Sequence, residues 1–166
     1  GNHEISSSYF EARFGTDKWY SMNVDNIHYV ILDSNTSLAS GSTQYNWLHS
    51  DLDGVPAATR FTLVFFHHPP YSVGGLADAI ALFETHGVDI VFNGHTHLYA
   101  KKVSSGIYYF ITGGGGAPLY SCPVSDYTPC DSEYEYVRLL LNNNQLELRT
   151  YNSSGTLIDT VDLPGV

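Results

Sequence analysis

The chain has 166 residues, the size of one ordinary domain, and 43% of them are hydrophobic, which is typical of a globular protein with a buried core. Its 17 acidic and 7 basic residues give a formal charge of -10, so we expect no binding to a nucleic-acid backbone, which requires a cationic surface. No apolar run approaches the roughly 20 residues that span a bilayer, so we expect no membrane segment.

The first half of the chain alternates between apolar strands and amphipathic helices. Residues 27–33, 61–66 and 88–92 are rich in β-branched and aromatic side chains and predict strands, the last two covered on both faces. Apolar residues at helical spacing predict helices over 41–53 and 76–86, and a glycine follows each. This order predicts an α/β fold in which polar residues at the strand ends form the functional site.

The second half of the chain changes to strands separated by turns. Strands are predicted over 107–112, 134–141, 145–151 and 157–161, with turns rich in Asn, Ser and Gly between the last three. We expect these strands to be antiparallel and to form or join a second sheet. No repeat, charged block or linker divides the chain, so residues 1–166 are interpreted as a single domain.

Histidines gather at the ends of the predicted apolar strands. His67 and His68 follow one strand, His95 and His97 follow the next, and His3 lies beside Asn2 at the start of the chain. Side chains at positions i and i+2 of an extended stretch share a face, so His95 and His97 could bind two neighbouring metal ions. Each cluster alone has a plainer interpretation as an ordinary strand end, but the combination favours a metal site.

In this order, the motifs GNHE, VFFHHPPY and GHTH resemble those of the calcineurin-like metallophosphoesterase superfamily, especially its purple-acid-phosphatase-like branch. The segment FITGGGGAPLY is similar to the glycine-rich segment that bacterial members carry after the last histidine motif. The resemblance covers nearly the whole chain. It implies an α/β fold of the four-layer αββα sandwich type and a hydrolase that cleaves small phosphate esters by means of metal-activated water.

The resemblance also implies roles for particular residues. Asn2, His67 and His95 would bind one metal ion and His97 the other, and the complete domain would hold two divalent or trivalent ions, Fe, Mn or Zn. Imidazole and amide ligands suit such metals.

His3 would act near the scissile ester, either protonating the leaving oxygen or stabilising charge on the phosphoryl group. His68 could either contact substrate or serve only as a spacer in the loop, so no role is assigned to it. Glu4 is interpreted as a loop carboxylate rather than a ligand.

Two motifs that precede GNHE in the family are not found in these 166 residues. They supply the aspartate that bridges both metal ions and the other ligands of the first ion. We therefore expect the sequence to be the C-terminal part of a phosphoesterase domain, whose N-terminal part is its missing partner, with little or no activity in isolation. The alternative is a non-catalytic metal-binding or interaction domain derived from the same fold. A secreted β-rich binding module would leave the histidine clusters unexplained.

Cys122 and Cys130 are the two cysteines, and they lie in a loop interrupted by prolines. The sequence is compatible both with a local disulfide between them and with two unrelated buried thiols. The scarcity of lysine and the abundance of tyrosine and serine favour an exported protein, so the expected location is extracellular or periplasmic.

Overall fold

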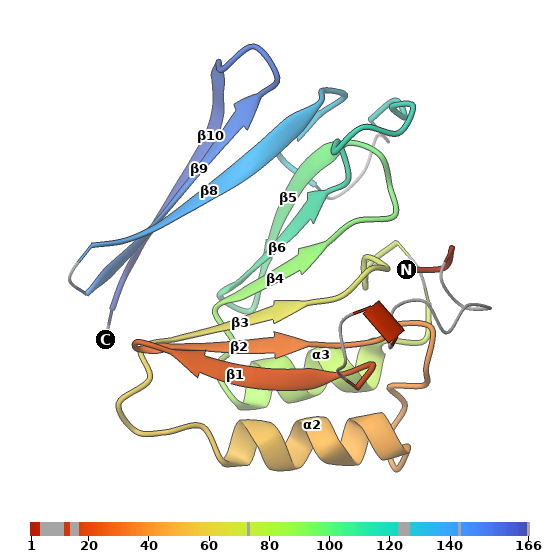
Figure 1. Ribbon diagram of the computed structural model, residues 1–166, viewed down its shortest axis with the longest axis vertical. Helices are drawn as coiled ribbons and strands as arrows, with labels where there is room; N and C mark the ends of the chain where they lie inside the picture. Colours follow the sequence, from red (N-terminus) through yellow and green to blue (C-terminus); the bar gives the residue numbers. More distant parts are fainter. Residues whose placement is uncertain (4–11, 14–16, 73, 123–126, 143, 166) are drawn as a thin grey trace.

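A computed structural model of the chain describes residues 1–3, 12–13, 17–72, 74–122, 127–142 and 144–165. The strands are Tyr20–Val24 (β1), Ile27–Ile31 (β2), Phe61–Phe65 (β3), Ile90–Asn93 (β4), Tyr99–Ser104 (β5), Ile107–Thr112 (β6), Cys130–Asp131 (β7), Glu135–Asn142 (β8), Gln145–Asn152 (β9) and Leu157–Pro164 (β10), and the helices are Thr43–Asp53 (α2) and Ala77–Thr85 (α3). The strands form a seven-stranded sheet of order β1-β2-β3-β4-β6-β5-β7 and a three-stranded sheet of order β10-β9-β8 (Figure 1).

The centre of the seven-stranded sheet is parallel. β2, β3, β4 and β6 pair in parallel, and α2 and α3 form the crossovers between β2, β3 and β4. Leu63 of β3 and Ile90 of β4 are partners in register and are both fully buried, as expected for strands covered on both faces. The predicted βαβ order and the adjacency of strands 61–66 and 88–92 are confirmed.

The prediction that strand 107–112 belongs with the later strands is wrong. β6 joins the seven-stranded sheet beside β4, with Tyr108 opposite Ile90, and contributes side chains to both faces. It is reached through a hairpin with β5, a strand that the sequence analysis missed because Lys101 and Lys102 interrupt its apolar pattern. The predicted strands over 134–141, 145–151 and 157–161 do form a separate antiparallel sheet.

Helices α2 and α3 pack against one face of the seven-stranded sheet (Figure 1). Ser42 caps α2, because its Oγ accepts a hydrogen bond from the amide of Tyr45 at 3.3 Å, and Gly54 ends the helix as predicted. Leu48 of α2 and Phe83 of α3 are fully buried in the core that the helices share with the strands.

The three-stranded sheet covers the other face (Figure 1). Leu146 and Leu148 of β9 pack in one buried cluster with Phe92 of β4 and Phe110 of β6. The fold is therefore α/β and of the predicted class, with helices, a mixed sheet and a small antiparallel sheet as its layers. A fourth, helical layer is not found among the residues that the structure describes.

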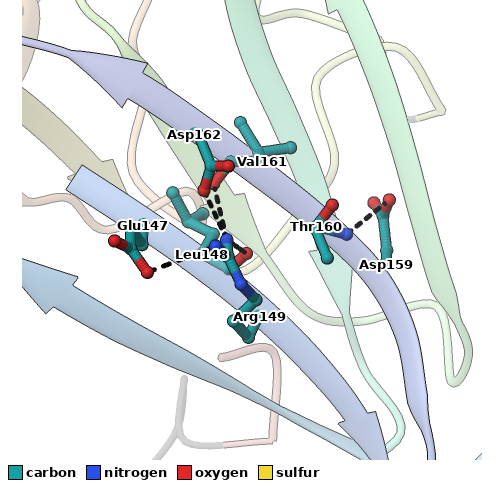
Figure 2. A network of polar contacts seen from close by, with 7 residues as sticks. All are labelled: Glu147, Leu148, Arg149, Asp159, Thr160, Val161 and Asp162. Atoms are coloured by element: carbon teal, nitrogen blue, oxygen red, sulfur yellow. Dashed lines mark hydrogen bonds and ion pairs between the residues drawn. The ribbon is translucent and has the colours of Figure 1, made fainter. Parts of the chain in front are cut away.

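Asp159 of β10 connects the two sheets. Its carboxylate accepts hydrogen bonds from the Tyr99 hydroxyl at 2.6 Å and from Lys101 Nζ at 2.8 Å, both on β5. Figure 2 shows Asp159 beside a second polar network, in which Arg149 of β9 contacts Asp162 and Glu147. The first network joins the two sheets, whereas the second lies within the small sheet.

The two cysteines form a disulfide, which resolves the alternative left open by the sequence. Cys122 and Cys130 pack against a small buried cluster that contains Leu98 and Ile111. None of the helices in the described part of the chain is long and apolar enough to cross a membrane.

Candidate metal centre

Hydrogen bonds hold the carboxyl ends of β3 and β4 together. The amide of Phe66 donates to the carbonyl of Phe92 at 3.1 Å, and the amide of Gly94 donates to the carbonyl of His67 at 3.0 Å. The side chain of Asn93, which is buried, donates from Nδ2 to the Phe66 carbonyl at 2.9 Å. Because the two strands are parallel, the residues that follow them meet at the same edge of the sheet.

At this edge the side chains of Asn2, His67 and His95 converge. His67 Nε2 lies 2.8 Å from Asn2 Oδ1 and 3.2 Å from His95 Nδ1. His68 joins the group, since His67, His68 and His95 each offer a ring nitrogen within 4.8 Å of the others. The structure thus brings together three of the residues to which the sequence assigned metal binding, and it adds His68.

The distances within this group fit donor atoms that share one metal ion. Donors bound to an ion at about 2.1 Å lie roughly 3–3.5 Å from one another, close to the separations from His67 Nε2 to Asn2 Oδ1 and His95 Nδ1. In the absence of an ion, a single proton on His67 Nε2 can satisfy only one of these two neighbours. Imidazole nitrogen and amide oxygen are suitable ligands for a borderline divalent metal.

The loop after β2 positions the start of the chain. Asn35 Nδ2 donates to the carbonyl of Gly1 at 3.1 Å and to Asp33 Oδ1 at 2.9 Å. Burial alone would raise the pKa of Asp33, but hydrogen bonds from Asn35 and Thr36 outweigh burial and lower that pKa. The ionised carboxylate therefore orders the loop that holds Gly1, and with it Asn2.

His3, the predicted catalytic residue, follows Asn2 directly and is exposed to solvent. Its neighbour in the chain, Asn2, is one of the converging residues. Glu4 lies outside the described residues.

His68 is tied to the same loop after β2. Ser34 Oγ accepts a hydrogen bond from the His68 amide at 3.1 Å and lies 2.8 Å from His68 Nδ1. Burial, followed by the proximity of His95, lowers the pKa of His68, so its ring is neutral near pH 7. The sequence offered no signal for this pairing, because the two residues are 34 positions apart.

His97 lies outside the group formed by His67, His68 and His95. The expected extended stretch is not observed: His95 has φ 62°, and residues 95–98 form a bend before β5. His97 stacks on Tyr120 at a centroid distance of 4.5 Å, and its Nδ1 lies 2.9 Å from the Pro118 carbonyl. Because a carbonyl can only accept, Nδ1 carries the proton and the Nε2 of the neutral ring keeps its lone pair.

The glycine-rich loop after β6 packs against the GHTH segment. A Cβ at Gly113 would collide with the carbonyl oxygen of Thr96, so this close approach requires glycine. The amide of the next residue, Gly114, donates to Glu135 Oε1 at 3.1 Å, and burial raises the pKa of Glu135. The loop that resembles the glycine-rich family segment thus supports the backbone beside His97.

The family model for calcineurin-like phosphoesterase matches residues 1–99. Purple acid phosphatase 18 of Arabidopsis thaliana is 34% identical over 117 residues, covering 63% of this chain and 27% of its own length. Purple acid phosphatase 15 of Arabidopsis thaliana is 32% identical over 152 residues, covering 70% of this chain and 28% of its own length. The chain therefore spans less than a third of the length of these relatives.

Solved structures show the same fold. A purple acid phosphatase from yellow lupin (Lupinus luteus) seeds superposes with a TM-score of 0.76 at 19% identity, over 88% of this chain and 32% of that one. GAP50, the anchor in the inner membrane complex of Plasmodium, gives a TM-score of 0.71 at 19% identity, over 89% of this chain and 55% of that one.

Proposed function

Because this chain belongs to the calcineurin-like phosphoesterase family, we propose that it is the histidine-bearing part of a metal-dependent hydrolase that cleaves small phosphate esters. The observation that carries the proposal is the convergence of Asn2 Oδ1, His67 Nε2 and His95 Nδ1. Two relatives named as phosphatases support the same reaction class.

Asn2, His67 and His95 are the proposed ligands of one ion, and His97 is proposed to bind a second through Nε2. Zn, Mn or Fe ions would supply the Lewis-acid chemistry that activates water and polarises the phosphoryl group. The Pro118 carbonyl favours the tautomer of His97 in which Nε2 presents a lone pair to a metal. His68 offers a further nitrogen to the first ion, within the same 4.8 Å group.

His3 is the proposed general acid. Its exposed imidazole follows the proposed ligand Asn2 in the chain, and an imidazole can deliver a proton to the leaving oxygen of a bound ester. For any metal-dependent hydrolysis that the chain supports, His3→Ala should lower kcat by about 10²–10⁴ with an alkyl phosphate. The loss should be smaller with p-nitrophenyl phosphate, whose leaving group needs no proton. Equal activity of His3→Ala and the parent chain on an alkyl phosphate would remove His3 from the mechanism.

The disulfide favours an oxidising compartment, so we place the protein outside the cell or in the periplasm.

These 166 residues offer the second ion fewer ligands than the first. No aspartate in a bridging motif is present, and His97 is the one donor that the resemblance assigns to that ion. We expect these residues to bind one divalent ion at the Asn2, His67 and His95 group and a second ion, through His97, less tightly. Hydrolysis by the chain would favour the hydrolase over the alternative of a non-catalytic metal-binding domain, since both are expected to bind an ion.

A zinc titration followed by the imidazole ¹⁵N resonances tests the ligand set, because it reports on each histidine separately. The His67 and His95 resonances should shift together, and His95→Ala should weaken that binding by at least about tenfold. His97→Ala is the matched control, since it removes a neighbouring imidazole from outside the group and should leave this affinity unchanged. Unshifted His67 and His95 resonances in millimolar zinc would contradict the proposed site.

A further inference from the structure

A second cluster of metal-ligand side chains lies where helices α2 and α3 end. His49 and Asp53 belong to the last turns of α2, and His86 is the C-terminal cap of α3. Among the described residues, these three and the His67, His68 and His95 group are the clusters in which each member offers a ligand atom within 4.8 Å of the others. Nothing in the phosphoesterase proposal uses them.

The cluster lies at the opposite end of the sheet from the proposed catalytic site. The parallel strands deliver His67 and His95 at their carboxyl ends, and the helices then run back beneath the sheet toward the amino ends (Figure 1). The carboxyl ends of both helices therefore meet at the far edge of the molecule.

The geometry within the cluster is close to that of a shared ion. His86 Nε2 lies 3.1 Å from Asp53 Oδ1, and His49 Nδ1 lies 3.7 Å from Asp53 Oδ2. The two imidazole rings are 5.4 Å apart and nearly perpendicular. His49 and Asp53 are four residues apart on one helix and so share a face.

Hydrogen bonding already orients His86 as a ligand. Its Nδ1 lies 2.9 Å from the carbonyl of Leu82, which can only accept, so the ring proton is on Nδ1. In the neutral ring the Nε2 lone pair then faces the lone pairs of the Asp53 carboxylate, an arrangement that needs a positive charge between them. Either a second proton or a metal ion supplies it, and a backbone carbonyl on the remote nitrogen is the usual support for a metal-bound imidazole.

Both helix ends attract a cation. The carboxyl end of a helix carries partial negative charge, and neither α2 nor α3 has a basic residue in its last turn. The side chains of Asp53 and His49 are 60% and 51% exposed, so an ion can reach them and small rotations can close the remaining distance, whereas His86 is 13% exposed and held in place.

We propose that His49, Asp53 and His86 form a surface site for a divalent transition metal, zinc by preference. Two imidazoles and a carboxylate are a ligand set that zinc accepts, with water completing the coordination. Bound zinc connects the ends of α2 and α3, so its function is to stabilise the helical layer rather than to take part in hydrolysis.

The test is a zinc titration of the full chain, followed by the imidazole ¹⁵N resonances. The His49 and His86 resonances should shift together, and Asp53→Asn should weaken the affinity read from them by at least about tenfold. Asp131→Asn is the matched control, because it makes the same charge change outside the cluster, in the edge strand β7 of the seven-stranded sheet. It should leave the affinity unchanged.

A double variant, His67→Ala with His95→Ala, separates this proposal from that of the catalytic site. Zinc should still raise the melting temperature of this variant, and adding His49→Ala, an exposed substitution, should abolish that rise. His49 and His86 resonances that stay unchanged in millimolar zinc, or an Asp53→Asn affinity equal to that of the parent chain, would overturn the proposed site whatever His67 and His95 do.

Discussion

Backbone carbonyls decide which ring nitrogen carries the proton in two of the histidines. The Pro118 carbonyl engages Nδ1 of His97, and the Leu82 carbonyl engages Nδ1 of His86, so each neutral ring presents Nε2 as a lone pair. A ring whose tautomer and orientation are already fixed loses less freedom when it binds an ion. Both residues are therefore oriented by their own surroundings for the ligand roles proposed for them.

The loop after β2 should make the stability of the protein depend on pH. The pKa of Asp33 is lowered, so its contribution to stability is fully present above the unfolded value near 4 and is lost as the pH falls through the lower folded value. Asp33→Asn should reduce the free energy of unfolding at pH 7 by about 1 kcal/mol, the usual contribution of a hydrogen bond. The difference between variant and parent chain should shrink below about pH 4.

Urea unfolding at pH 7 and at pH 3 measures this effect. Asp25→Asn is the control, because Asp25 is exposed in the β1–β2 turn with φ 53°, a conformation that asparagine tolerates. A difference between Asp33→Asn and the parent chain that is the same at both pH values would show that ionisation of Asp33 does not order the loop.

At the scale of elements, the glycine-rich loop after β6 holds the GHTH segment in place. Gly113→Ala should push its new methyl group into the carbonyl of Thr96, displace His95 and His97, and weaken metal binding at the proposed catalytic site by about tenfold. Gly115→Ala is the matched control, since a Cβ there meets nothing within 4 Å. The measurement is the zinc affinity of each variant, read from its His67 and His95 resonances. Equal affinities would mean that the segment is held by other contacts.

How well the sequence predicted an element depended on how it is buried. β3 and β4 were predicted because both of their faces are covered, which leaves an unbroken apolar run. β1 and β5 were missed because they carry polar residues, such as the exposed Asn23 and the half-buried Lys102, and gain their strand conformation from neighbours. The assignment of β6 to the second sheet failed for the same reason, since its position depends on the hairpin with β5.

The candidate site was predictable to the extent that it follows the strand ends. His67 and His95 could be placed together because parallel strands deliver their following residues to one edge. The contacts that hold the neighbouring residues could not be predicted, because Ser34, which contacts His68, and Asn35, which donates to Gly1, lie in a loop that resembles an ordinary turn and are each 34 positions from their partners. The sequence did not predict the left-handed backbone conformation of His95 either, since glycine is the usual residue at such φ values.

At the scale of the whole molecule, the two sheets are joined by an apolar interface and by a partly buried polar group centred on Asp159. Burial, together with the hydrogen bond to Asp159, raises the pKa of Tyr99, so this hydroxyl stays protonated and donates to the carboxylate. Lys101 completes the group, and the side chains of Asp159 and Lys101 are only 13% and 14% exposed. Asp159 is the acceptor that the Tyr99 hydroxyl and the Lys101 ammonium share.

Asp159→Ala should therefore destabilise the whole fold. It leaves the Lys101 ammonium and the Tyr99 hydroxyl without their shared acceptor, and removing one partner of a buried ion pair costs about 3 kcal/mol. Asp162→Ala is the matched control from the same strand, because Asp162 is 47% exposed and its ion pair with Arg149 lies within the small sheet, so little change is expected (Figure 2). Urea unfolding gives both free energies, and hydrogen exchange in β8, β9 and β10 shows whether the small sheet separates first. If Asp159→Ala unfolds at the same urea concentration as Asp162→Ala, the apolar interface alone holds the two sheets together.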